Sequence, residues 1–419
     1  MKQPFFNFSD RILALSYEAG GICRGPFSEI EETAAFNACK VLSAFQKHRV
    51  GESHFTGTTG YGYGDRGRDT LDAVFASVFG AEDALVRHQF VSGTNAITTA
   101  LFGVLRPGDR MVSVSGTPYD TLHAVLGLRG KNYGSLKDFG IQYEELPLRK
   151  DGKVDLEKIP EAVKGAKIAY LQRSRGYSLR PSITVGEIER ISKIIRTADK
   201  NVIFMVDNCY GEFVEKREPT GAGADLIIGS LIKNPGGGIA RTGGYIAGRA
   251  DLIELCAHRM TSPGAGRDVG CSLDETKNMY MGLFLAPEVT AAALKTAVYA
   301  AAVFSKMGYR VLPAAHEYRT DVIQAVVLKS EERLLAFCRG IQRGAPVDSF
   351  VTPQAWDMPG YEDRVVMAAG AFHMGASIEL SADGPVREPY AAWMQGGLTA
   401  ATGRLGVLLA AQELDSCTD

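Results

Sequence analysis

Apolar residues follow two alternating patterns through the first two thirds of the chain. Stretches with apolar residues three and four positions apart are typical of amphipathic helices, and short apolar runs bounded by glycine or polar residues indicate buried strands. The predicted helices here are 30–45, 71–79, 92–105 and 185–198, and the predicted strands are 84–87, 109–114, 167–171, 202–206, 225–228 and 244–247. Short strands that alternate with helices indicate an α/β domain with a mostly parallel sheet.

The pattern changes after about residue 285. The predicted elements there are a long alanine-rich helix over Glu288–Met307, a strand over Val322–Leu328, a helix ending at Arg343 and a strand over Ala376–Leu380. They indicate a smaller C-terminal α/β domain. We therefore expect an N-terminal arm over 1–60, a large domain over 61–285 and a small domain over 286–419.

Composition narrows the class of protein. The 419 residues are 45% apolar and 22% charged, as in ordinary globular proteins, and the formal net charge of -2 gives no field that would recruit nucleic acid or an acidic membrane. The first residues lack a long apolar core before a cleavage site, and no run of about 18 apolar residues occurs. The cysteines number seven and form no CxxC pair, which favours reduced thiols over a disulfide framework or a metal site. We expect a cytoplasmic protein without a metal.

A lysine follows one of the predicted strands within the segment 224–238. The apolar run ends at Ser230, and Lys233 comes three residues later, before Asn-Pro and three glycines. Among apolar residues its ammonium can be desolvated, which lowers the pKa and frees the amine for imine formation. Most lysines lie on the surface, however, so this residue alone leaves both interpretations open.

A carboxylate ends the preceding apolar strand. Asp207 is costly to bury without a partner, and the alternative is that it caps the next helix. In enzymes that use pyridoxal 5'-phosphate (PLP), such a carboxylate keeps the pyridine nitrogen protonated, so that the ring acts as an electron sink. Because Asp207 lies on the strand before the one that leads to Lys233, neighbouring strand ends would bring both residues to one cofactor. The pair points to PLP more specifically than either residue does.

Small residues open the helix that follows the first strand. Backbone N–H groups and hydroxyls of Ser92, Gly93 and Thr94 can bind a phosphate at a helix N-terminus, although an ordinary helix cap explains the same residues. Ser230 can add a hydroxyl to the same phosphate. The segment is not a P-loop, and no GxGxxG follows a strand, which disfavours a nicotinamide enzyme.

Aromatic residues suggest further contacts. Tyr119, after the strand 109–114, can stack on a flat cofactor ring or can be a core residue. Tyr61 and Tyr63 belong to a glycine-rich segment, Gly57–Asp65, which is either a flexible surface loop or a loop that presents the tyrosines to a binding site.

Arginines are candidates for binding a substrate carboxylate, because the guanidinium can bind it through two hydrogen bonds. Arg387 follows a Gly-Pro turn after a predicted strand, where a solvated arginine is at least as common. Arg173 and Arg175 are further candidates and can instead line the cofactor.

With these residues identified, the sequence resembles the PLP enzymes of fold type I, and most closely the group of methionine gamma-lyase-like or aluminium-resistance proteins, which are related to the cystathionine lyases. The resemblance covers nearly the whole chain. It is carried by the runs GYGYGDRGRDTLDAVFA, VRHQFVSGTNAI, LRPGDRMVSVSGTPYDTL, LQRSRGYSLRPSIT, VDNCYGEFVE, GADLIIGSLIKNPGGGIARTGGYIAG, FLAPEVT, TDVIQAVV, IELSADGPVREPY and QGGLT.

The resemblance implies a large domain with a mostly parallel seven-stranded sheet and a smaller C-terminal α/β domain. Lys233 is then the Schiff-base lysine and Asp207 the partner of the pyridine nitrogen. The other expected cofactor contacts are Ser92, Gly93, Thr94 and Ser230 at the phosphate and Tyr119 on the ring. Tyr63 resembles the tyrosine that cystathionine lyases send into a neighbouring subunit's site, which implies a homodimer or homotetramer with shared active sites.

Some positions depart from the cystathionine lyase pattern. Those enzymes place an arginine two residues after the equivalent of Tyr63, where this chain has Asp65 followed by Arg66. Their substrate-binding arginine lies in an Ile-Arg-Leu-Ser strand, which here contains Glu379. Asn95 stands where the group has a histidine. We therefore expect Arg387, with Tyr61 and Arg173, to contact the substrate.

These observations favour a PLP enzyme that removes or replaces a group at the β or γ carbon of an amino acid. Lys233, once released as a free amine, would remove the α proton before a thiol or another group leaves. Methionine, cystathionine, an activated homoserine and S-adenosylmethionine all suit this chemistry. An aminotransferase or an aldolase would use the same lysine and aspartate, and a scaffold protein that has kept the fold is a further alternative.

Overall fold

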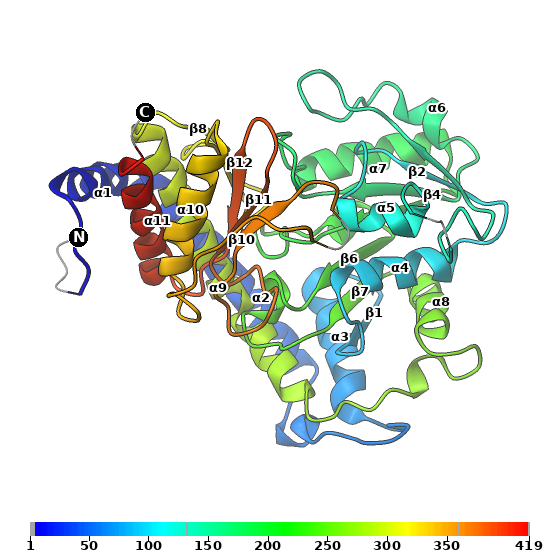
Figure 1. Ribbon diagram of the computed structural model, residues 1–419. Helices are drawn as coiled ribbons and strands as arrows, with labels where there is room; N and C mark the ends of the chain where they lie inside the picture. Colours follow the sequence, from blue (N-terminus) through cyan, green and yellow to red (C-terminus); the bar gives the residue numbers. More distant parts are fainter. Residues whose placement is uncertain (1–4, 131–132, 359–360, 418–419) are drawn as a thin grey trace.

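The computed structural model describes residues 5–130, 133–358 and 361–417 (Figure 1). The larger of its two sheets has seven strands. Their order is β1-β7-β6-β5-β4-β2-β3. β7 runs antiparallel to its two neighbours, and the other pairs are parallel, so the prediction of a mostly parallel seven-stranded sheet is confirmed. The strands are β1 (Asp83–Arg87), β2 (Arg110–Ser113), β3 (Gln142–Glu145), β4 (Ile168–Gln172), β5 (Ile203–Asp207), β6 (Leu226–Ser230) and β7 (Gly244–Gly248).

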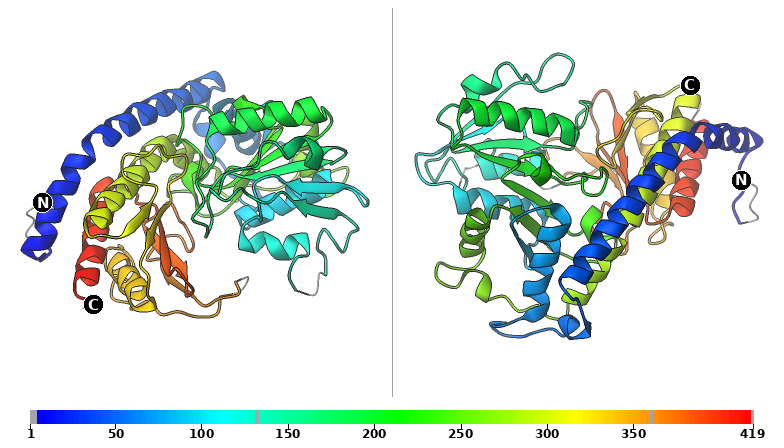
Figure 2. Two further views of the ribbon diagram at one scale, coloured as in Figure 1. Left: turned by 90° about the horizontal axis from the view of Figure 1, so that it is seen from above. Right: turned by 180° about the vertical axis from the view of Figure 1, so that it is seen from behind.

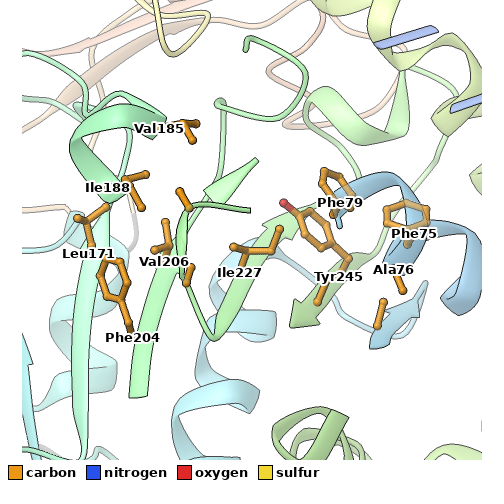
Figure 3. Close-up of a cluster of buried hydrophobic side chains, with 14 of the residues drawn as sticks. Phe75, Ala76, Phe79, Leu171, Val185, Ile188, Phe204, Val206, Ile227 and Tyr245 are labelled. Carbon is orange, nitrogen blue, oxygen red and sulfur yellow. The ribbon is translucent and has the colours of Figure 1, made fainter. Parts of the chain in front are cut away.

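The central strands are buried on both faces, which explains their continuous apolar sequences. Because successive side chains of a strand point to opposite faces, Phe204 and Val206 of β5 pack with α3 and α7, whereas Ile203 and Met205 pack with α4, α5 and α8. Figure 3 shows the first of these layers, with Phe204 and Val206 beside Ile227 of the next strand. The sheet is thus covered by helices on both sides.

The helices are α1 (Asp10–Ile22), α2 (Arg24–Lys47), α3 (Arg66–Phe79), α4 (Gly93–Val104), α5 (Asp120–Leu126), α6 (Ile159–Val163), α7 (Val185–Ala198), α8 (Ala250–Met260), α9 (Thr276–Lys306), α10 (Glu331–Arg343) and α11 (Ala400–Asp415). Two of them are long and lie side by side, α2 and α9 (Figure 2). Within the described residues, α9 is the one helix long and apolar enough to cross a membrane, and most of that stretch is buried against the rest of the protein. It therefore packs as a core helix.

The second sheet is antiparallel and lies against α9, α10 and α11. Its strand order is β10-β11-β12-β9-β8. The strands are β8 (Arg310–Leu312), β9 (Gln324–Val327), β10 (Val365–Ala368), β11 (Ser381–Pro385) and β12 (Ala391–Gln395). Helix α1 packs here too, through Ile12 and Ala19, so part of the predicted N-terminal arm joins the core of the second sheet.

The strand predicted over Ala376–Leu380 is wrong. This segment is a turn, and β11 begins only at Ser381. The buried Glu379 carboxylate accepts hydrogen bonds from the backbone N–H groups of Phe372 (2.9 Å) and His373 (3.0 Å), which folds the segment back on itself. Its apolar side chains are buried by this turn, which explains why the sequence resembled a strand.

The predicted boundary between residues 285 and 286 falls within α9. The beginning of this helix packs with the large sheet through Met279 and Leu283, and its end packs with the second sheet through residues 298–304. One continuous helix therefore joins the two cores.

Candidate active site

Polar side chains gather where three neighbouring parallel strands end. Gln172 ends β4, Asp207 ends β5 and Ser230 ends β6. Ligand sites in open α/β sheets form at this carboxyl edge. A cavity of about 260 Å³ lies there, between the edge and the second sheet. The predicted residues that line it are Ser92, Gly93, Thr94, Tyr119, Asp207, Ser230 and Lys233.

Lys233 lies three residues beyond β6, just before the short 3-10 helix Asn234–Gly236. Its Nζ atom lies 4.2 Å from the centre of the Tyr210 ring. Burial acts to lower the pKa of the Lys233 ammonium, but the neighbouring Cys209, Tyr210 and Asp207 groups raise it above its usual value. The prediction that desolvation alone frees the amine is therefore wrong for the chain alone, because these three neighbouring groups together outweigh burial.

Asp207 is buried, and no arginine or lysine of the described residues forms an ion pair with its carboxylate. Its Oδ1 atom accepts a hydrogen bond from the Cys209 N–H (3.1 Å), and the Tyr170 hydroxyl donates to Oδ2 over 3.5 Å. These neutral partners orient the carboxylate without neutralising it, and its charge acts on the Lys233 ammonium in the same cavity. The carboxylate can therefore pair with a protonated ring nitrogen in the cavity.

The small residues before and within α4 provide a place for an anion. The Ser92 hydroxyl accepts from the Asn95 N–H (3.0 Å), so it caps the helix and lines the cavity as well. A Cβ atom on Gly93 would come within 3.1 Å of Ser230 Cβ, so glycine keeps this approach open. The Ser230 hydroxyl is buried and makes no hydrogen bond within the described part of the chain. A phosphate at the α4 N-terminus would satisfy it.

Tyr119 is held at the cavity wall from both ends. Its backbone N–H donates to the Gln172 side chain (2.6 Å), and its hydroxyl is hydrogen bonded to that of Tyr361 (2.7 Å). Burial raises the pKa of the Tyr119 hydroxyl, and Tyr361 and Asp383 add to this. The hydroxyl therefore keeps its proton at neutral pH.

Neither proposed substrate arginine lines this cavity. Arg173 is fully buried, and its guanidinium is bound by Glu215 (2.7 Å), Asn208 (2.7 Å) and the Gly211 carbonyl (2.9 Å), which leaves it turned into the protein. Arg387 is half exposed and pairs with Asp363 (2.7 Å). It lines a neighbouring hollow that shares Tyr119 with the cavity, so it lies near the site without entering it.

Tyr61 and Tyr63 also lie outside the cavity of their own chain. Both are exposed, and their rings stack at 5.5 Å. The loop that carries them is held by the buried Arg68 guanidinium, which donates to the carbonyls of Gly62 and Gly270 (3.0 Å each). The segment therefore has a defined shape and presents two aromatic rings outward.

Several cavity residues were not predicted from the sequence. Those with polar, sulfur-containing or aromatic side chains include Gln172, Tyr177, Cys209, Tyr210, Tyr361, Asp383, Trp393 and Gln395. Gln172, like Asp207, is a polar residue at the end of an apolar strand, so the same sequence pattern could have identified it. Those from the second sheet reach the site only through tertiary packing, and no local pattern identifies them.

The fold and this cavity define the class. The architecture is that of the fold type I PLP enzymes: a mostly parallel seven-stranded sheet, a lysine beyond β6 and a second, antiparallel sheet. YhfS, a PLP-dependent protein of Escherichia coli, shares this fold with a TM-score of 0.60. The two sequences are 18% identical, and the match covers 91% of this chain and 97% of YhfS. Residues 13–415 match the methionine gamma-lyase family, and the chain belongs to it. The predicted resemblance is confirmed.

Two close relatives and one distant relative illustrate the relationship. The uncharacterised Bacillus subtilis protein YnbB is 52% identical over 90% of each chain. A crystal structure of a carbon-sulfur lyase involved in aluminium resistance from Clostridium novyi matches with a TM-score of 0.93 and 48% identity over 96% of each chain. The L-methionine gamma-lyase of Pseudomonas putida is 29% identical over 44% of this chain and 41% of its own.

Proposed function

We propose that the protein is a PLP-dependent enzyme that eliminates or replaces a group at the β or γ carbon of an amino acid and thereby breaks a carbon–sulfur bond. The observation that carries the proposal is the convergence of three features in one cavity. These are an amine on Lys233, a carboxylate on Asp207 whose hydrogen-bond partners are neutral, and a Ser230 hydroxyl that has no hydrogen-bond partner among the described residues. Family membership supports the same class of chemistry.

The residues present fit the cofactor at each of its polar groups. Ser92, Gly93, Thr94 and Ser230 would hold the phosphate at the α4 N-terminus, and Asp207 would pair with the ring nitrogen. That pairing would neutralise Asp207, one of the three groups that raise the pKa of Lys233, and would so favour loss of the Lys233 proton. The aromatic ring of Tyr119 would cover the cofactor ring.

When bound, PLP supplies an electron sink for negative charge at the substrate's α carbon. Lys233 Nζ, released as a neutral amine, would accept the α proton. The Tyr119 hydroxyl keeps its proton because burial raises its pKa, and it would donate a hydrogen bond to the departing sulfur. Cavity walls from both sheets would limit the access of water.

Assembly and location belong to the same proposal. The outward rings of Tyr61 and Tyr63 suit a site shared with a second copy of the chain, in a homodimer or homotetramer. An arginine near the contact between the two copies would then bind the substrate carboxylate. Arg387 and Arg66 are the candidates. We further propose that the enzyme works in the cytoplasm on a small amino acid.

A screen of amino acids tests the proposed function. Purified protein saturated with PLP is incubated with methionine, cystathionine, O-activated homoserine and S-adenosylmethionine, and ammonia, 2-oxo acid and the leaving group are measured together. The leaving group is a thiol from the first two, an acid from the activated homoserine and a thioether from S-adenosylmethionine. Equal amounts of ammonia, 2-oxo acid and this leaving group indicate elimination. Lys233→Ala should abolish all three products, whereas Lys329→Ala, a change in the second domain outside the cavity, should not. Transfer of an amino group to an added 2-oxo acid, with no leaving group released, would overturn the lyase assignment.

A further inference from the structure

The cavity contains a second buried carboxylate that the chemistry described above does not use. Asp383 lies on β11, in the second sheet, and lines the cavity with Asp207 and Lys233. Its Oδ1 atom is buried and makes no hydrogen bond of ordinary length and angle within the described residues, and the side chains that act on the carboxylate, Tyr177 and Gln395, are uncharged. The carboxylate can therefore accept a further contact from a ligand in the cavity.

Within the described part of the chain, no lysine or arginine forms an ion pair with Asp383. Among the described residues that line the cavity, Lys233 is the one lysine or arginine, and it is placed against Tyr210. Burial raises the pKa of the Asp383 carboxyl to about 7, and the side chains that act in the opposite direction, Tyr177 and Gln395, are uncharged. A buried carboxylate without a cation is costly, so the site favours a ligand that brings one.

Aromatic rings surround this carboxylate. The centre of the Tyr177 ring lies 5.2 Å from that of Trp393, 5.7 Å from that of Tyr361 and 5.6 Å from that of Tyr119. The faces of such rings attract ammonium and other onium groups through the negative charge of their π systems. Rings and carboxylate together form the pattern by which proteins recognise organic cations.

We propose that Asp383, with Tyr177, Tyr361 and Trp393, forms a subsite for a positively charged group on the substrate's side chain. The inference rests on the proposed function, because it assumes that the α-amino group of the substrate is held at Lys233. The substrate is then an amino acid whose distal group is a cation, either a sulfonium or an ammonium. A sulfonium would also leave as a neutral thioether, which needs no hydrogen bond from Tyr119.

Matched ligand pairs test the subsite directly. L-Methionine and S-methyl-L-methionine differ by one methyl group and one positive charge, and L-norvaline and L-ornithine make the corresponding pair for an ammonium. Binding of each to the PLP-saturated protein is measured by calorimetry, and the absorbance of the cofactor is recorded on the same samples. We expect the cationic member of one pair to bind at least about tenfold more tightly, given a desolvated cation site.

Three variants identify the residues responsible. Asp383→Asn keeps the shape of the side chain and should reduce the ratio of the two dissociation constants towards one. Tyr361→Leu removes a ring and should reduce the ratio, whereas Tyr361→Phe keeps the ring and should retain it; this pair serves if Asp383→Asn does not fold. Asp251→Asn, at an exposed carboxylate on α8, controls for the loss of one negative charge and should leave the ratio unchanged.

The outcomes separate the two proposals. Equal binding within both pairs, or a preference that survives Asp383→Asn and Tyr361→Leu, would overturn the cation subsite. If amino acids still change the cofactor absorbance in that case, the proposed function stands without the subsite. If no ligand changes the absorbance and no cofactor is bound to Lys233, the proposed function fails, and the subsite inference that rests on it fails too.

Discussion

Replacing Arg173 by glutamine tests whether this arginine stabilises the fold or binds the substrate. Its guanidinium is fully buried and contacts Glu215 at 2.7 Å, and the buried Glu218 carboxylate lies 3.8 Å away. Arg173→Gln leaves both carboxylates without their cation. Removing one partner of a buried ion pair costs about 3–5 kcal/mol of unfolding free energy.

This loss converts into a measurable change in melting temperature. With an unfolding entropy of about 2.1 cal/mol/K per residue over the 419 residues, the thermal midpoint should fall by about 3–6 °C. Differential scanning calorimetry measures it. Arg387→Gln is the control, because this half-exposed arginine forms a surface pair that contributes no more than about 1 kcal/mol. An unchanged midpoint in Arg173→Gln, together with weaker amino-acid binding, would refute the structural role and restore Arg173 as a substrate ligand.

Asp207→Asn should lower turnover about tenfold or more while most of the cofactor stays bound, because an amide cannot hold a proton on the ring nitrogen by charge; near-normal turnover would contradict that role. Mixing the inactive variants Tyr63→Ala and Lys233→Ala should restore part of the activity if the site is shared between chains, and tagged hybrids that form but remain inactive would rule this out. Burial raises the pKa of Glu212 from 4.5 to about 8, so the folded chain holds a proton that the unfolded chain loses, and stability should fall as pH rises through this window. Glu212→Gln should flatten that decline in thermal midpoint, and an unaltered pH dependence would place the loss at another group.

Residues at strand ends were the part of the site that the sequence could reveal. Asp207, Ser230 and Lys233 follow continuous apolar runs, and parallel strands bring their carboxyl ends to one edge, so local pattern and sheet geometry suffice to group them. The seven-stranded sheet itself came from the resemblance to a known fold, and the structure confirms it.

Residues that depend on tertiary contacts could not be assigned in the same way. Arg173 directly follows the buried strand β4 and looks as available as any cavity residue, but its partners Glu215 and Glu218 come from a distant loop. Asp383 reaches the cavity because the second sheet packs against the first, and no spacing in the sequence indicates that. Ile378 and Leu380 resembled a strand because they are buried, while the hydrogen bonds to Glu379 fold them into a turn.

The central claim is that Lys233 carries the cofactor covalently, and borohydride reduction followed by peptide mass mapping tests it most directly. Purified protein is incubated with PLP, reduced, digested and analysed for the peptide that gains the mass of the reduced cofactor. The account predicts that mass on Lys233, and its absence from every peptide of Lys233→Ala. The cofactor mass on any other lysine of the wild-type protein, or on none, would contradict the account.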